Sequence, residues 1–198
     1  MAKHMDFYYD FSSPNAYFSC AQIKDVLKRT GATIFWKPIV LGGVFKDLNT
    51  TPPMQQSSQK AAYMPKDMER WAKKYHIPFR FPSIFPMNTI NALRGALDVE
   101  QMNKDRLVPY IDTVFDAYWA EDKDISNDEV LGEIVTRLGL DRQRFFTLIN
   151  SQEIKDALRD ITAEAEKRGA FGTPTFFVGQ EMFWGKDRLD FVEDELKG

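Results

Sequence analysis

The stretch Phe7-Tyr-Tyr-Asp-Phe-Ser-Ser-Pro-Asn-Ala-Tyr17 decides the fold. Its aromatic first half predicts a buried strand over residues 6–11, and Pro14 opens an amphipathic segment that predicts a helix over 14–29. Ser13 then lies at the N-terminus of that helix, where free N–H groups and the helix dipole stabilise an anion. A thiolate is such an anion, but the stretch contains no cysteine. We therefore expect the thiol to come from elsewhere.

The length and the charge of the chain limit the classes of protein to which it can belong. The 198 residues are enough for one sizeable domain or a domain with a large insertion. A formal net charge of −3 gives no support for nucleic acid as the main partner. We see no apolar window of membrane-spanning length and no signal peptide. Residues 1–4 resemble an expression-tag remnant ahead of Met5, and the fold prediction leaves them out.

The single cysteine, Cys20, cannot form an intramolecular disulfide, so a reducing cytoplasm is the expected location. Cys20 lies two turns into the first helix among apolar neighbours. A small buried side chain is therefore favoured over a reactive thiol. His76 stands alone and no ligand spacing typical of metal sites is present, so we expect no metal.

The rest of the chain divides into two sheet-forming parts and a helical middle. A second strand over 32–38 follows Gly31, and the C-terminal part predicts a helix over 152–168, strands over 175–179 and 181–184, and a final helix over 186–196. The middle shows helical periodicity over 63–75, 89–99, 107–119, 127–138 and 141–149, with Ser126-Asn-Asp-Glu129 as a capping box. This order predicts an α/β, thioredoxin-like fold with a large all-helical insertion: a thioredoxin-like domain of residues 5–40 and 150–198, and an insertion of 41–149.

Two C-terminal motifs have both a structural and a functional interpretation. Thr173-Pro174 precedes a strand, and taken alone it favours an ordinary trans proline. Its spacing from Ser13 raises the odds of a cis proline that faces the first helix, with the preceding residue offering its backbone to a peptide. Lys186-Asp187 opens the last helix. Taken alone it favours an ordinary helix start, although Asp187 could also accept an ammonium group.

Several motifs together resemble a known family. They are Tyr9-Asp-Phe-Ser-Ser-Pro, Gly42-Gly-Val-Phe-Lys, Thr51-Pro-Pro, Arg70-Trp-Ala, Ile77-Pro-Phe, Gly169-Ala-Phe-Gly-Thr-Pro-Thr-Phe-Phe and Phe183-Trp-Gly-Lys-Asp-Arg-Leu. Their order and spacing resemble the 2-hydroxychromene-2-carboxylate isomerase family, which is related to kappa-class glutathione transferases and DsbA-type thiol oxidoreductases. The resemblance extends from Phe7 to Leu196.

The resemblance implies glutathione as cofactor and assigns roles to individual residues. Ser13 is implied as the catalytic residue, stabilising the glutathione thiolate. The implied glutathione-binding set is Ser13, Asn49, Thr50, Thr173, Lys186 and Asp187, with Asn49 one position earlier than the asparagine of many relatives. The implied substrate set is Val44, Phe45, Lys46, Phe85 and Asn88, although burial in the core explains the two phenylalanines equally well. Trp71 and Tyr75, four apart on a helix, are expected in the core.

The implied activity is glutathione-dependent cis–trans isomerisation of a 2-hydroxychromene-2-carboxylate type aromatic pyruvate derivative, by transient thiol addition. Two alternatives stay open: a kappa-like glutathione transferase acting on electrophiles, and a non-catalytic thioredoxin-like binding module. A disulfide oxidoreductase is disfavoured because Ser13 and Ala16 occupy both cysteine positions of its Cys-x-x-Cys motif. The expected partners are a small aromatic electrophile and, by resemblance, a second copy of the chain in a homodimer.

Overall fold

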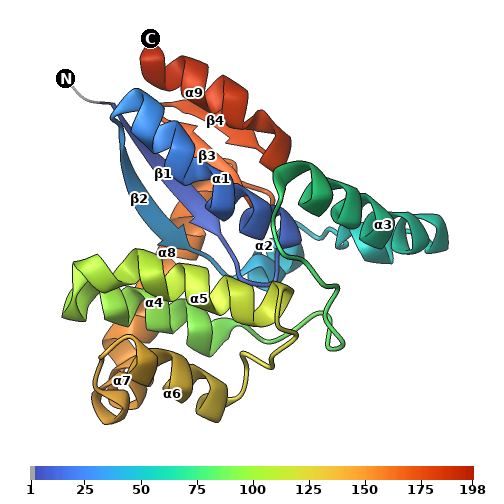
Figure 1. Cartoon of the computed structure of the whole chain (residues 1–198). Helices are drawn as coiled ribbons and strands as arrows, with labels where there is room; N and C mark the ends of the chain where they lie inside the picture. Colours follow the sequence, from blue (N-terminus) through green and yellow to red (C-terminus); the bar gives the residue numbers. More distant parts are fainter. Residues whose placement is uncertain (1–2) are drawn as a thin grey trace.

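The computed structural model describes residues 3–198, and its strands form one sheet in the order β2–β1–β3–β4 (Figure 1). The bounds of the strands are β1 His4–Tyr9, β2 Thr33–Pro38, β3 Thr175–Val178 and β4 Glu181–Trp184. β1 and β2 are parallel, whereas β3 is antiparallel to both β1 and β4. The two ends of the chain thus share one sheet, as the sequence predicts for a thioredoxin-like fold.

The helices follow the predicted order closely. Their bounds are α1 Pro14–Thr30, α2 Leu41–Asp47, α3 Ser58–Tyr75, α4 Ile90–Met102, α5 Leu107–Trp119, α6 Asp128–Arg137, α7 Arg142–Ile149, α8 Gln152–Lys167 and α9 Leu189–Lys197. Short 3₁₀ turns cover Pro53–Gln55 (η1), Lys104–Arg106 (η2) and Lys186–Arg188 (η3). Between residues 3 and 198 we find no helix that is long and apolar enough to span a bilayer.

Side chains of β1 alternate between two apolar layers, as the pleat of a strand requires. Phe7 belongs to the large core that extends into α1, α4 and α5, whereas Tyr8 packs with Ala165 of α8 and Phe177 of β3 in a smaller cluster. Figure 1 shows α1 and α9 side by side over one face of the sheet and α8 behind it. The sheet is therefore covered on both faces.

Three local predictions need correction, and one helix has no counterpart among the predicted elements: Gly42 and Gly43 lie in α2. The side chain that caps α6 is Asn127, not Ser126, because its Oδ1 accepts the Glu129 N–H at 2.8 Å. His4 belongs to β1 and pairs with Thr33, so the first strand begins earlier than predicted. The last helix is preceded by the separate 3₁₀ turn η3.

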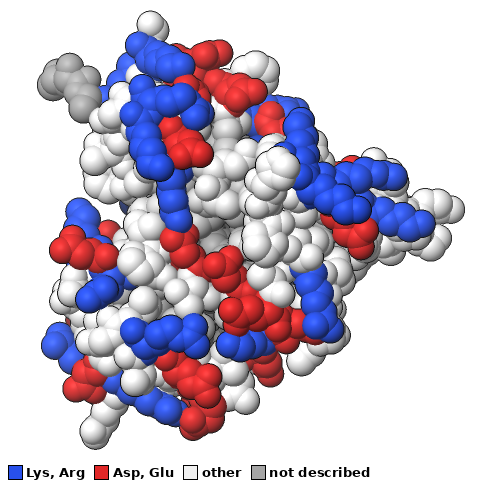
Figure 2. All heavy atoms as spheres, in the orientation of Figure 1, with Lys and Arg blue, Asp and Glu red and all other residues white. Residues whose placement is uncertain are grey.

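Charge is mixed on the surface that Figure 2 shows. Basic and acidic side chains are interspersed there, and acidic ones gather in the middle of this face, over α5. A nucleic-acid surface needs a continuous basic stripe. Basic side chains also gather over α3 in this view, so the face has one basic and one acidic region, and the net charge of the whole sequence is slightly negative.

Candidate functional site

Ser13 is the N-cap of α1. Its Oγ accepts the Ala16 N–H at 3.2 Å, and its backbone carbonyl accepts the first helical bond from Tyr17. Pro14 at the first helical position has no N–H, and the Asn15 N–H has no hydrogen-bond partner within residues 3–198. No acidic residue lies in the first turn to oppose an anion. The tip of α1 thus presents a hydroxyl and a free N–H where the helix dipole is positive.

Thr173 lies against Ser13. The Ser13 hydroxyl donates to the Thr173 carbonyl at 3.0 Å, although 160 residues separate the two in sequence. The Thr173–Pro174 peptide is cis, and the Thr173 N–H and the buried Oγ1 have no partner within the described residues. The loop before β3 therefore offers donor groups beside the tip of α1.

The Lys186–Asp187 turn joins the same end of the sheet. Gly185 N–H donates to the Pro174 carbonyl at 3.1 Å, which holds the start of η3 beside the cis-proline loop. Gly185 has a φ of 111°, and a Cβ there would lie 2.8 Å from Asp187 Oδ1, so glycine is required. Asp187 is exposed and pairs with Arg188 at 2.7 Å.

Lys186 is held against an aromatic ring of α3. Its Nζ lies 4.6 Å from the ring centroid of Trp71, and burial lowers the pKa of its ammonium group. Lys74 Nζ lies 4.7 Å from the same centroid. Trp71 is half-buried and packs against the core, as predicted, but it also contacts a predicted cofactor-binding residue, which the sequence analysis does not foresee.

Asp10 is the residue that the sequence analysis misses. It is 2% exposed, and its carboxylate accepts hydrogen bonds from Ser12 N–H at 2.9 Å, Leu41 N–H at 2.8 Å and Thr89 Oγ1–H at 2.7 Å. Burial raises its pKa, and these hydrogen bonds oppose that rise. Asp10 thereby ties the Ser13 loop to the starts of α2 and α4. A charged residue inside an aromatic run was the signal available in the sequence.

The five site residues predicted on and after α2 differ in their exposure to solvent. Val44 is fully buried in the small apolar cluster, Phe45 is half-buried, and Lys46 is exposed. Asn49 and Thr50 are exposed beyond the end of the helix, with Asn49 at a φ of 49°. None of the five has a hydrogen bond to Ser13 or Thr173. The hydrogen bond from Leu41 N–H to Asp10 fixes the start of α2 against the Ser13 loop.

Phe85 and Asn88 precede α4. Phe85 is 36% exposed, and its ring lies 5.2 Å from that of Phe81 and 6.1 Å from that of Trp119. Asn88 is exposed, and its Oδ1 accepts the Ile90 N–H at 3.1 Å. Phe85 is thus a partly exposed aromatic surface rather than a core residue, and Asn88 helps to begin α4.

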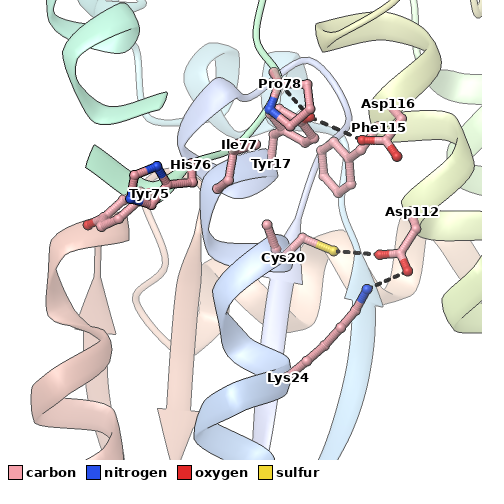
Figure 3. A pocket seen from close by; sticks show the side chains of 11 residues that line it. Tyr17, Cys20, Lys24, Tyr75, His76, Ile77, Pro78, Asp112, Phe115 and Asp116 are labelled. Atoms are coloured by element: carbon pink, nitrogen blue, oxygen red, sulfur yellow. Dashed lines mark hydrogen bonds and ion pairs between the residues drawn. The ribbon is translucent and has the colours of Figure 1, made fainter. Parts of the chain in front are cut away.

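A cavity of about 380 Å³ lies farther along α1, between α1, α5 and the end of α3 (Figure 3). Cys20 Sγ contacts Asp112 Oδ1 at 3.6 Å, and Lys24 pairs with the same carboxylate. The Tyr17 hydroxyl lies 2.7 Å from the Pro78 carbonyl and 3.1 Å from an oxygen of Asp116. No predicted site residue lines this cavity.

Cys20 itself is 2% exposed and free, which confirms the prediction of a buried side chain. Burial raises the pKa of its thiol well above the ordinary value, and the Asp112 charge adds to that rise. The thiol is therefore kept protonated and unreactive.

Comparison with known proteins decides the family. Residues 4–197 match the model of the DSBA-like thioredoxin domain. The chain belongs to this family. It is 32% identical over 197 residues to the 2-hydroxychromene-2-carboxylate isomerase of Sphingobium xenophagum, an alignment that covers 99% of both chains. Glutathione S-transferase kappa 1 of Rattus norvegicus is 23% identical, with 95% of this chain and 88% of that protein covered.

A solved structure of 2-hydroxychromene-2-carboxylate isomerase superposes with a TM-score of 0.87 at 30% identity, covering 96% of this chain and 93% of that one. Within the DSBA-like family the chain is therefore related to the 2-hydroxychromene-2-carboxylate isomerases and, more distantly, to kappa-class glutathione transferases. The thioredoxin-like fold predicted from the sequence is confirmed.

Proposed function

We propose that this protein is a glutathione-dependent isomerase of 2-hydroxychromene-2-carboxylate type substrates. The observation that carries the proposal is the Ser13 hydroxyl, held between the tip of α1 and the Thr173 carbonyl. It stands where a thiolate would be stabilised, in a chain whose own thiol is buried elsewhere. The kinship with named isomerases supplies the reaction class.

The groups around Ser13 fit glutathione. Bound glutathione would supply a thiolate that adds to the conjugated carbon of the substrate and leaves again after bond rotation, so that no thiol is consumed. Ser13 would donate its hydroxyl to the sulfur, exchanging the Thr173 carbonyl for it, and the free Asn15 N–H lies at the same helix tip. These donors favour the thiolate over the thiol.

The rest of the tripeptide would bind along the cis-proline loop. The Thr173 N–H is an available donor for a peptide carbonyl. Asp187 would accept the ammonium of the γ-glutamyl end, and Lys186, on the same turn, would attract a carboxylate. We keep Asn49 and Thr50 as proposed cofactor contacts, since both are exposed beyond the end of α2.

The substrate would lie over the sulfur, against α2 and the segment before α4. Phe45 and Phe85 would supply aromatic surface, while Lys46 and Asn88 would donate to the enolate that forms on thiol addition. Val44, which has no exposed surface, would contribute by packing beneath them.

The test is an absorbance assay on 2-hydroxychromene-2-carboxylate with and without glutathione, combined with a count of free thiol. We expect turnover only with glutathione and an unchanged thiol count. Calorimetry that finds no binding of glutathione would overturn the proposal and favour a binding module. Turnover at the same rate without glutathione would also overturn it.

A kappa-like glutathione transferase is the second candidate, favoured by the kinship with kappa-class enzymes. The same residues would hold the thiolate, and only the fate of the adduct differs. Loss of one thiol for each molecule of an electrophile such as 1-chloro-2,4-dinitrobenzene, without isomerase turnover, would support it. We also propose a homodimer, which light scattering after size-exclusion chromatography tests directly.

A further inference from the structure

A second cavity lies on another side of the molecule. It has a volume of about 290 Å³ and is lined by residues of α4 and α8 and by both ends of α2. This volume is close to the lower limit of pockets that take small molecules. None of the residues predicted for the glutathione site lines it.

Arg94 of α4 is an unpaired cation in this cavity. Its Nε is buried without a hydrogen-bond partner, and within residues 3–198 no carboxylate forms an ion pair with its guanidinium group. Burial lowers the pKa of Arg94. A buried donor left unpaired is costly, so proteins rarely keep one without a reason. The guanidinium fork matches the two oxygens of a carboxylate.

Glu166 of α8 lacks a hydrogen-bond donor, whereas Arg94 lacks an acceptor. Its Oε1 is buried without a partner in the described part of the chain. Burial and the nearby charge of Asp47, at the end of α2, raise the pKa of Glu166. Arg94 and Glu166 both line this cavity, from α4 and α8, and no ion pair joins them among residues 3–198.

Charged side chains of both signs line the cavity along α8. Lys155, Arg159 and Glu166 all line the cavity from one side of α8. Lys155 and Glu166 are separated by 11 residues, which is roughly 16 Å along a helix axis. Arg159 already pairs with Asp156 and Asp160, whereas Lys155 has no ion pair among residues 3–198. Along α8 the lining therefore runs from Lys155, a cation with no ion pair among residues 3–198, to the unpaired carboxylate oxygen of Glu166.

We propose that this cavity binds a small zwitterion of the amino-acid class, with its carboxylate on Arg94 and its ammonium group on Asp47 and Glu166. One ligand of this kind satisfies both buried unpaired groups at once. A simple anion would leave Glu166 unpaired, and a simple cation would leave Arg94 unpaired. The proposal does not depend on the glutathione site, because the two share no residue.

Calorimetry on the full-length protein tests it with glycine, 4-aminobutanoate and 6-aminohexanoate, which separate the two charges by increasing lengths. Butanoate and butylamine are the matched singly charged controls. We expect at least one of the zwitterions to bind at least tenfold more tightly than both controls. Absence of binding by all three, or butanoate binding as tightly as the best zwitterion, would overturn the proposal.

Variants assign the contacts. Arg94→Gln should weaken binding at least tenfold, and Glu166→Gln should remove the preference for the zwitterion over butanoate. Arg137→Gln, at an exposed arginine of α6, is the control and should bind as the wild type does. Arg94→Lys keeps the charge without the fork, so it tests the contact if Arg94→Gln unfolds. If Arg94→Lys and Arg94→Gln both fold and both bind the zwitterion with wild-type affinity, Arg94 does not contact the ligand and the assignment is overturned.

Binding of the zwitterion to Ser13→Ala distinguishes the second cavity from the proposed glutathione site. The zwitterion should bind this variant with unchanged affinity whether or not glutathione binding is lost. Loss of zwitterion binding in Ser13→Ala would mean that the probe occupies the glutathione site, and would overturn the second site without touching the proposed function.

Discussion

The tip and the interior of one helix treat a potential nucleophile in opposite ways. At the tip of α1, Ser13 has free N–H groups beside it and no acidic residue in the first turn. Two turns on, Cys20 is enclosed by apolar side chains and faces Asp112. The tip favours an anion, while the interior suppresses one. The position along the helix, more than the residue type, decides where sulfur chemistry is possible.

The carboxylate beside each position differs as well. Asp10 is buried and fully used as a hydrogen-bond acceptor that joins three segments around Ser13. Asp112 is about a third exposed and pairs with Lys24 at the surface. We therefore expect substitutions around Ser13 to lower the stability of the protein strongly and substitutions around Cys20 to lower it little.

Removing the Ser13 hydroxyl should have the largest effect. In Ser13→Ala the thiolate loses its side-chain donor, so we expect kcat/KM for the glutathione-dependent reaction to fall about 100- to 1,000-fold. The thiolate also becomes less stable, so the pH–rate profile should move to higher pH. Thermal melting checks the fold, and Cys20→Ala, with expected near-normal activity, is the matched control. Full activity in a folded Ser13→Ala would remove Ser13 from the mechanism.

Asp10→Ala should destabilise the protein by about 3 kcal/mol, a factor of roughly 150 in the unfolding equilibrium. The change leaves the Ser12 and Leu41 N–H groups and the Thr89 hydroxyl without their acceptor. Chemical denaturation measures it. Asp10→Asn keeps the shape and one acceptor oxygen, so about half of the loss is expected. A change below 1 kcal/mol in Asp10→Ala would contradict the role of Asp10 as an organiser.

Moving the thiol to the helix tip should reverse its reactivity. In Ser13→Cys combined with Cys20→Ala, the new thiol occupies a site type that lowers thiol pKa values to about 3.5–7.5. We expect iodoacetamide to alkylate it about 100-fold faster at pH 7 than it alkylates the buried Cys20 of the wild type. Equal rates would mean that the tip of α1 does not stabilise a thiolate.

The sequence predicts the regular elements better than their assembly around the site. Helix periodicity locates α5 to the residue, and the aromatic run before Pro14 identifies β1 within two residues. The pattern of α2 is hidden because Gly42 and Gly43 suggest a turn, whereas packing of Val44 against α8 stabilises a helix there. Glycine propensity is a weak argument once a neighbouring element buries the same segment.

The candidate site, too, can be predicted from the sequence only in part. Ser13 can be placed from sequence because proline marks a helix start, and Thr173 follows from its spacing and the resemblance. Asp10 could not be placed, because its partners Leu41 and Thr89 are distant in sequence and meet only in the folded chain. The contact of Trp71 with Lys186 was missed for the same reason, since it joins α3 to the distant turn η3.

Asp112→Asn should have the smallest effect. The ion pair with Lys24 is partly solvated, so the expected loss of stability is below about 1 kcal/mol. The negative charge of Asp112 raises the pKa of Cys20, and its removal lowers that pKa, so alkylation of Cys20 should become faster. Burial is the larger cause of the raised pKa and is unchanged, so the increase should stay below about threefold. Iodoacetamide kinetics at pH 8 measure it, with Glu133→Gln, at an exposed carboxylate of α6, as the control. A tenfold increase would show that charge, rather than burial, suppresses the reactivity of the Cys20 thiol, and the contrast between the tip and the interior of α1 would then be electrostatic at both positions.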